Sequence, residues 1–161
     1  MPVRAGEGGE SRMAPNKAKE YLESRIKTAP KEELLLLLLD GAIRFAEQGR
    51  VRLMEKDYGQ SCPLLIRSQR IVTELRLALR QDLIGEEIYA NLVRLYNFVY
   101  RRLVEANLDH EAVKVDEALA ILGKLREMWA EAIERARAER VGDGAAGAAP
   151  EVTRPSLNVQ G

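Results

Sequence analysis

Apolar residues recur at helical spacing along most of this chain, and they predict four long helices. Residues at i, i+3, i+4 and i+7 are apolar in each of these stretches, which is typical of amphipathic α-helices. Turn signals such as Thr28-Ala29-Pro30 interrupt the pattern. No stretch alternates with a period of two, so strands are not expected. The helices are expected over about Lys31 to Glu55, Ser61 to Arg80, Glu86 to Ala106 and His110 to Arg140.

Four helices of this length with short connectors predict an all-α fold, an antiparallel four-helix bundle. A short amphipathic helix is expected before the bundle, at Asn16 to Ile26, with Tyr21, Leu22 and Ile26 at helical spacing. Residues 1–15 are expected to be a disordered leader, and residues 16–140 form the helical domain. Residues 141–161 are rich in Gly, Ala and Pro and are expected to be a disordered tail.

A bundle helix needs one apolar stripe, about 100° wide, to face the core. Placing residues at intervals of 100° predicts one such stripe on each helix. The predicted stripes are Leu34, Leu38, Ala42, Phe45 and Gly49; Leu64, Ser68, Ile71, Val72, Leu75 and Leu79; Ile88, Leu92, Leu95, Val99 and Leu103; and Val115, Ala118, Leu122, Leu125, Trp129 and Ala132.

The first three helices carry more apolar residues than one stripe can use. For any single surplus residue, irregular core packing or lone exposure is the commoner explanation. Together they indicate a groove for an amphipathic partner helix, because large contiguous apolar patches usually mark interaction sites and tyrosines suit such surfaces. The fourth helix has one apolar and one charged face and is expected to lie outside this groove. The surplus residues are Leu36, Leu39, Ile43, Ile66, Leu77, Tyr89, Val93, Tyr96, Tyr100 and Val104.

Composition narrows the function further. The 25 basic and 25 acidic residues cancel, which argues against nucleic-acid binding because that needs a clustered positive field. The apolar run from Leu34 ends at Asp40, too early for a membrane span of about 20 residues, so no membrane insertion is expected. The lone Cys62 fits a reducing compartment, and a cytoplasmic location in the cytosol is expected.

No arrangement of residues points to catalysis. A di-iron bundle needs Glu-x-x-His pairs on two helices, whereas His110 is the only histidine. A phosphotransfer bundle needs an exposed histidine in the middle of a helix, but His110 lies at a predicted helix start. Cys62 has no base nearby in the sequence and is expected to be inert. We therefore expect no enzyme activity, no cofactor and no metal.

Three segments of the chain, taken in order, form a recognisable pattern. They are Thr28-Ala29-Pro30-Lys31-Glu32-Glu33-Leu34 with Asp40-Gly41-Ala42-Ile43-Arg44-Phe45; Asn91 to Asn107; and Ala118-Leu119 with Leu125-Arg126-Glu127-Met128-Trp129. Together they resemble the FliS family of flagellar secretion chaperones. The resemblance covers about residues 16–137, and the chain departs from the family pattern at Leu39, where a tyrosine is usual, and at Ala18.

The resemblance implies a cytosolic export chaperone. Such a protein binds the C-terminal helical segment of flagellin, prevents premature polymerisation and delivers the subunit to the flagellar export apparatus. It also implies that the segment with Tyr21, Leu22 and Ile26 covers part of the groove in the free protein, which is expected to be a monomer or weak homodimer. The residues alone leave open an adaptor or regulatory bundle that binds a different amphipathic helix.

Overall fold

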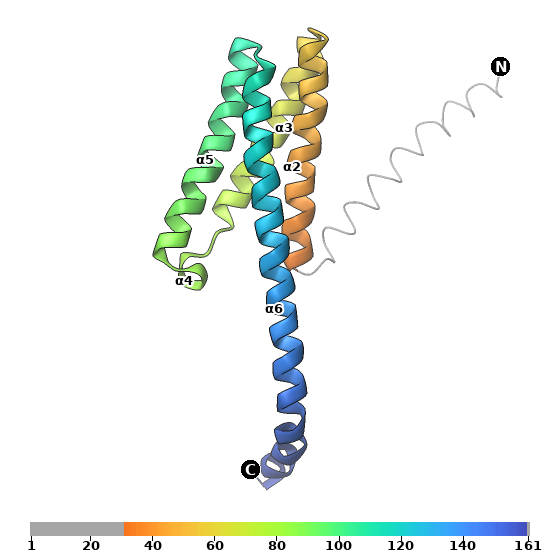
Figure 1. Cartoon of the computed structure of the whole chain (residues 1–161), viewed down its shortest axis with the longest axis vertical. Helices are drawn as coiled ribbons and strands as arrows, with labels where there is room; N and C mark the ends of the chain where they lie inside the picture. Colours follow the sequence, from red (N-terminus) through yellow and green to blue (C-terminus); the bar gives the residue numbers. More distant parts are fainter. Residues whose placement is uncertain (1–30, 161) are drawn as a thin grey trace, which may run out of the picture.

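The computed structural model of the chain describes residues 31–160, with side chains described for residues 31–144. The predicted all-α bundle is confirmed, and the described part of the chain contains no strand. The predicted leader at 1–15 and helix at 16–26 lie outside the described residues. The helices are α2 (Lys31–Met54), α3 (Tyr58–Leu77), the short α4 (Gln81–Ile84), α5 (Glu86–Asp109) and α6 (Ala112–Gln160) (Figure 1).

The four long helices form a closed ring of neighbours. Helix α2 packs against α3 and α6, and α5 packs against the same two helices on the other side. Consecutive helices run in opposite directions, so the α2–α3 and α5–α6 turns meet at one end of the bundle (Figure 1). There the rings of Tyr58 and His110 stack, with centroids 3.8 Å apart and planes 6° from parallel. This stack joins the two turns.

Capping moves several helix ends away from the predicted positions. Helix α3 begins at Tyr58 rather than Ser61, because the Asp57 side chain accepts a hydrogen bond from the backbone N–H of Gln60 at 3.3 Å. Helix α5 continues to Asp109 and ends at His110, whose φ of 56° is left-handed. The last helix therefore starts at Ala112 and not at His110.

Helices α2 and α3 pack closely against each other at Gly49. A Cβ placed on Gly49 would lie 2.7 Å from Leu65 Cδ2, so glycine is needed there for the helices to meet. Further along, the buried Ser68 hydroxyl donates a hydrogen bond to the carbonyl oxygen of Ala42 at 2.8 Å. These contacts fix the register of the two helices.

The buried core follows the predicted stripe on α6 from Val115 to Leu125, but Ala132, predicted in the core, is exposed and Ile133 is buried instead. On α2 and α5 the core is rotated from the predicted stripes. Leu39 and Tyr96, which the sequence places on surplus faces, are fully buried, and that placement is wrong. Ile88 and Leu95, predicted in the core, are exposed. The buried apolar cluster is Leu39, Ala42, Ala46, Leu53, Leu65, Val72, Leu75, Leu92, Tyr96, Val99, Leu103, Ala106, Val115, Ala118, Leu122 and Leu125.

The rotation has a geometric reason. The two candidate stripes on α5 lie beside each other, and the helix packs on the line between them because it touches both α3 and α6. Residues near that line, such as Leu103 and Tyr96, are buried, while the outer edges of both stripes stay at the surface. The apolar pattern alone does not say where this line falls.

Helix α6 continues to Gln160, past the predicted bundle boundary at Arg140, and projects beyond the other helices (Figure 1). Arg137 and Arg140 both pair with Glu32 of α2, at 3.7 and 3.1 Å. Helix α6 therefore still contacts α2 at Arg140, just before the Gly- and Ala-rich stretch begins. The prediction of the boundary used the amino-acid composition of that stretch, which carries no information about this contact.

Candidate partner-binding surface

Six of the surplus apolar residues lie together along the seam between α3 and α5. Leu77 and Tyr100 are exposed, at 68% and 42%, and the other four are half-buried. The name α3–α5 face is used here for Ile66, Leu77, Tyr89, Val93, Tyr100 and Val104.

Two observations indicate that these residues face one another across the seam between α3 and α5. The Asn107 side-chain amide of α5 donates to the Cys62 carbonyl of α3 at 3.4 Å. At the other end, Leu79 and Tyr89 line the same open hollow of about 590 Å³. In two antiparallel helices, the residue number rises along one helix as it falls along the other. Between the pair Cys62 and Asn107 and the pair Leu79 and Tyr89, this places Leu77 opposite Val93.

The hollow gives the α3–α5 face a polar end. Besides Leu79 and Tyr89 it is lined by Arg80, Gln81, Asp82 and Glu86. The Arg80 guanidinium pairs with Asp82 at 2.6 Å, and this ion pair lowers the pKa of the Asp82 carboxyl below its ordinary value. A partner helix on the apolar face would therefore meet a charged rim at this end.

The two remaining surplus residues, Leu36 and Ile43, lie elsewhere. They share a stripe of α2 with Arg50, which pairs with Asp116 of α6. Both are half-buried and pack against the core beside α6. The structure therefore does not bring them to the α3–α5 face. Leu39, between them, lines no surface because it is fully buried.

A second exposed apolar surface lies between α5 and α6 and was missed by the sequence reasoning. Ile88, Leu95 and Met128 are exposed, whereas Phe98 and Ile121 are half-buried. Ile88 and Leu95 are predicted in the core, but the same seven-residue spacing leads on to Arg102. This charged residue is the sequence signal that the stripe lies at the surface. The name α5–α6 face is used here for Ile88, Leu95, Phe98, Ile121 and Met128.

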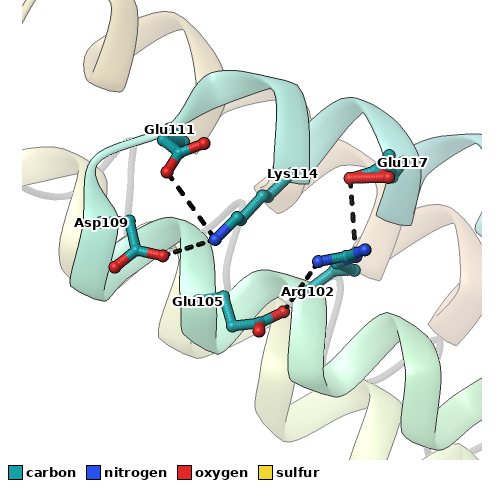
Figure 2. Close-up of polar contacts among 6 residues, drawn as sticks. All are labelled: Arg102, Glu105, Asp109, Glu111, Lys114 and Glu117. Atoms are coloured by element: carbon teal, nitrogen blue, oxygen red, sulfur yellow. Dashed lines mark hydrogen bonds and ion pairs between the residues drawn. The ribbon is translucent and has the colours of Figure 1, made fainter.

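Ion pairs close one end of the α5–α6 face (Figure 2). Arg102 lies between Glu105 of its own helix, at 3.1 Å, and Glu117 of α6, at 3.5 Å. Lys114 reaches back to Asp109 and Glu111 at the turn. The Arg102 guanidinium also lies 5.4 Å from the centre of the Phe98 ring. These contacts hold α5 and α6 in register.

Tyr96 connects the core to the same pair of helices. Its hydroxyl accepts a hydrogen bond from the Trp129 indole N–H at 3.0 Å. Burial raises the pKa of the Tyr96 phenol above its ordinary value, and the bond from Trp129 offsets part of that rise. The group serves packing, because it is closed off from any partner at the surface.

The described part of the chain shows neither a metal-binding group nor a membrane-spanning helix. Within it, no group of three or more His, Cys, Asp or Glu side chains is placed to hold a metal ion. No helix in that part is long and apolar enough to cross a membrane. Cys62 is exposed. The two apolar faces are therefore the main candidates for function.

Comparisons with known proteins agree on one family. The model of the family described as "Flagellar protein FliS" matches residues 13–136. The flagellar secretion chaperone FliS of Bacillus subtilis (strain 168) is 29% identical over 124 residues, which are 77% of this chain and 91% of that protein. The protein of the same name from Salmonella typhimurium is 31% identical over 113 residues, covering 70% of this chain and 83% of the relative.

A solved structure supports the fold. The chain is similar to the crystal structure of a flagellar chaperone from bacteria, with a TM-score of 0.61 and 20% sequence identity. The match covers 76% of this chain and 98% of that one.

Proposed function

The chain belongs to the FliS family of flagellar secretion chaperones, and from this premise we propose that it binds the C-terminal helical segment of flagellin in the cytosol. The family is one of chaperones and not of enzymes. In this proposal the bound subunit is kept from polymerising prematurely and is delivered to the flagellar export apparatus. The observation that carries the proposal is the α3–α5 face, which presents an apolar, tyrosine-bearing surface for a helix.

The energetics favour a partner that folds as it binds. Ordering a disordered segment commonly costs about 2–5 kcal/mol or more. An apolar side chain that passes from exposed to buried contributes roughly 1.5–3 kcal/mol, and a half-buried one about half of that. Six such residues on the α3–α5 face, together with the partner's own apolar side chains, can offset the ordering cost.

Occlusion follows from the same contact. A flagellin segment that buries its apolar stripe on α3 and α5 has no free stripe with which to pack against its neighbours in a filament. In this proposal, binding alone prevents polymerisation, and no chemical step is involved. Release then rests on handover to the export apparatus.

The test compares two leucines with similar exposure. Leu77 lies on the α3–α5 face and is 68% exposed, whereas Leu108 lies near the end of α5, outside both faces, and is 74% exposed. Neither Leu77→Asp nor Leu108→Asp removes core packing. We expect Leu77→Asp to weaken binding of a flagellin C-terminal peptide at least tenfold by calorimetry, since a carboxylate would be buried against apolar groups. Leu108→Asp should change the affinity less than twofold.

Val93→Asp extends the test to α5. It should also abolish most binding while the far-ultraviolet circular dichroism keeps its helical shape. Unchanged affinity in both Leu77→Asp and Val93→Asp would show that the partner does not use this face, and a loss confined to Leu95→Asp would move the site to the α5–α6 face. If the wild-type chain does not bind the flagellin peptide, the proposed function itself is wrong and a different helical partner must be sought by co-purification.

A further inference from the structure

Two arginines from different helices lie over one aromatic ring where α3 packs against α2. The Arg44 guanidinium is 5.4 Å from the centre of the Phe45 ring, and that of Arg67 is 5.5 Å from it. Both arginines are exposed and Phe45 is half-buried. The name Phe45 cluster is used here for Arg44, Phe45 and Arg67.

Neither arginine of the Phe45 cluster forms a salt bridge with an acidic side chain among the described residues. Asp40, one turn before Arg44, is bound by Arg126 of α6 at 2.9 Å. Most other arginines of the bundle do have a carboxylate partner, including Arg50, Arg80 and Arg102. Both guanidiniums of the cluster are therefore without a carboxylate partner among the described residues, on a chain whose total charge is zero.

The position of the two guanidiniums is set before any partner arrives. The α2–α3 packing fixes the distance between their helices, through the Gly49–Leu65 contact and the hydrogen bond from Ser68 to Ala42. The ring attracts both cations by its quadrupole, which restricts their rotamers. Less side-chain entropy is then lost when a ligand binds. A planar guanidinium is suited to a carboxylate because it can donate two parallel hydrogen bonds.

Three apolar side chains lie near the cluster. Leu64 and Ile71 lie one turn to either side of Arg67 on α3, and Leu38 lies two turns before Phe45 on α2. All three are half-buried. A ligand with both carboxylates and apolar side chains matches this surface better than a nucleic-acid backbone, which would need a larger basic area.

We propose that the Phe45 cluster is a second docking surface, and that its partner is an acidic helical segment of another protein, with two carboxylates one turn apart beside apolar side chains. Carboxylate residues at i and i+4 of a helix lie about 5–6 Å apart at Cβ. The guanidinium carbons lie 5.4 and 5.5 Å from one ring centre and are therefore at most about 11 Å apart, a span that the side chains of two such carboxylate residues can cover. The surface is separate from the α3–α5 face, since Arg67 is turned by about 100° around α3 from Ile66.

The experiment uses the full chain and two synthetic helical peptides. One peptide carries leucines and a pair of glutamates at i and i+4, and its twin carries glutamines in place of the glutamates. Binding is followed at low salt, where screening of exposed charges is weak, by fluorescence anisotropy. The side-chain Nε–Hε signals of the arginines are recorded by NMR. We expect the glutamate peptide to bind at least tenfold more tightly than its twin and to shift the Arg44 and Arg67 signals.

Matched double variants locate the site. Arg44→Gln with Arg67→Gln should weaken binding of the glutamate peptide at least tenfold. Arg94→Gln with Arg101→Gln removes the same charge from exposed positions on α5, where neither arginine has a salt bridge, and should change it less than twofold. Phe45→Leu keeps an apolar side chain but frees the guanidiniums, and should weaken binding about threefold. Thermal melts confirm that each variant is folded.

Three results would overturn the proposal. Equal binding of the two peptides would show that carboxylates are not recognised, and equal loss in the two double variants would show only a general charge effect. Tighter binding of a single-stranded oligonucleotide to the Phe45 cluster would assign the surface to nucleic acid instead. Val93→Asp should leave binding of the glutamate peptide unchanged, so that a failure of the α3–α5 proposal and a failure of this one are told apart.

Discussion

At the scale of residues, Tyr96 shows how burial changes the meaning of a side chain. The sequence places it on a surface for a partner, but the structure buries it completely and bonds its hydroxyl to Trp129. A charged substitution such as Tyr96→Glu would leave an unpaired charge in the core. It would report on stability and not on partner binding, which is why Leu77 and Val93 are the informative positions.

The raised pKa of Tyr96 predicts a loss of stability at alkaline pH. In the unfolded chain the phenol ionises near its ordinary value of 10.0, while in the folded chain it stays neutral to higher pH. The stabilisation is therefore complete below about pH 10 and falls as the pH rises further. Urea unfolding between pH 8 and 11 should show a steeper decline for the wild type than for Tyr96→Phe. Parallel declines would contradict the assignment to Tyr96.

Gly49 and Gly123 provide a matched pair of glycine substitutions. Gly49→Ala forces a Cβ against Leu65, at 2.7 Å, and should destabilise the bundle by about 1–3 kcal/mol because the core there cannot give way. Gly123→Ala meets no atom within 4 Å and should stabilise α6 by about 0.5–1 kcal/mol through helix propensity. The urea midpoints of the two variants measure this, and a stable Gly49→Ala would mean that α2 and α3 can move apart.

At the scale of elements, the number, order and direction of the long helices followed from the sequence, but the faces of α2 and α5 did not. Periodicity defines which residues share a face of one helix. Which line of α5 points inward depends on α3 and α6 together, and so Ile88 and Leu95 turned out exposed. Of the surplus residues predicted on α5, Tyr96 is buried and Tyr100 is exposed, whereas Val93 and Val104 are half-buried.

The end of α5 supplies an element-scale prediction. His110 adopts a left-handed φ of 56° and stacks on Tyr58. His110→Val places a β-branched residue in that conformation and should cost about 1–2 kcal/mol. His110→Gly loses the stack but adopts the conformation without strain, and should cost less than His110→Val. Thermal denaturation of both variants checks the order, and equal losses would assign the effect to the stack alone.

At the scale of the whole molecule, the described residues carry one continuous buried core. Every buried apolar side chain there lies between Leu39 and Ile133. Helix α2 begins at Lys31, after the segment expected to cover the groove. Stability of the fold and occupancy of the surface should therefore be separable by truncation.

Deleting residues 1–27 is the corresponding prediction. The truncated chain should keep its helical circular dichroism and melt within a few degrees of the full chain, because the buried residues from Leu39 to Ile133 are all retained. Under the proposed function its affinity for the flagellin peptide should rise, since the covering segment with Tyr21, Leu22 and Ile26 no longer competes. Unfolding at room temperature would show that the bundle depends on this segment.

The ring of helices also has a consequence for the order of folding. Helices α2 and α3 are joined by a short turn and pack closely at Gly49, so their hairpin needs only local contacts and can form while α6 is still being synthesised. The contact between α2 and α6 joins residues as far apart as Glu32 and Arg140. We expect this seam to close last, so a nascent chain would carry an open flank along α2 until α6 has been synthesised as far as Arg140.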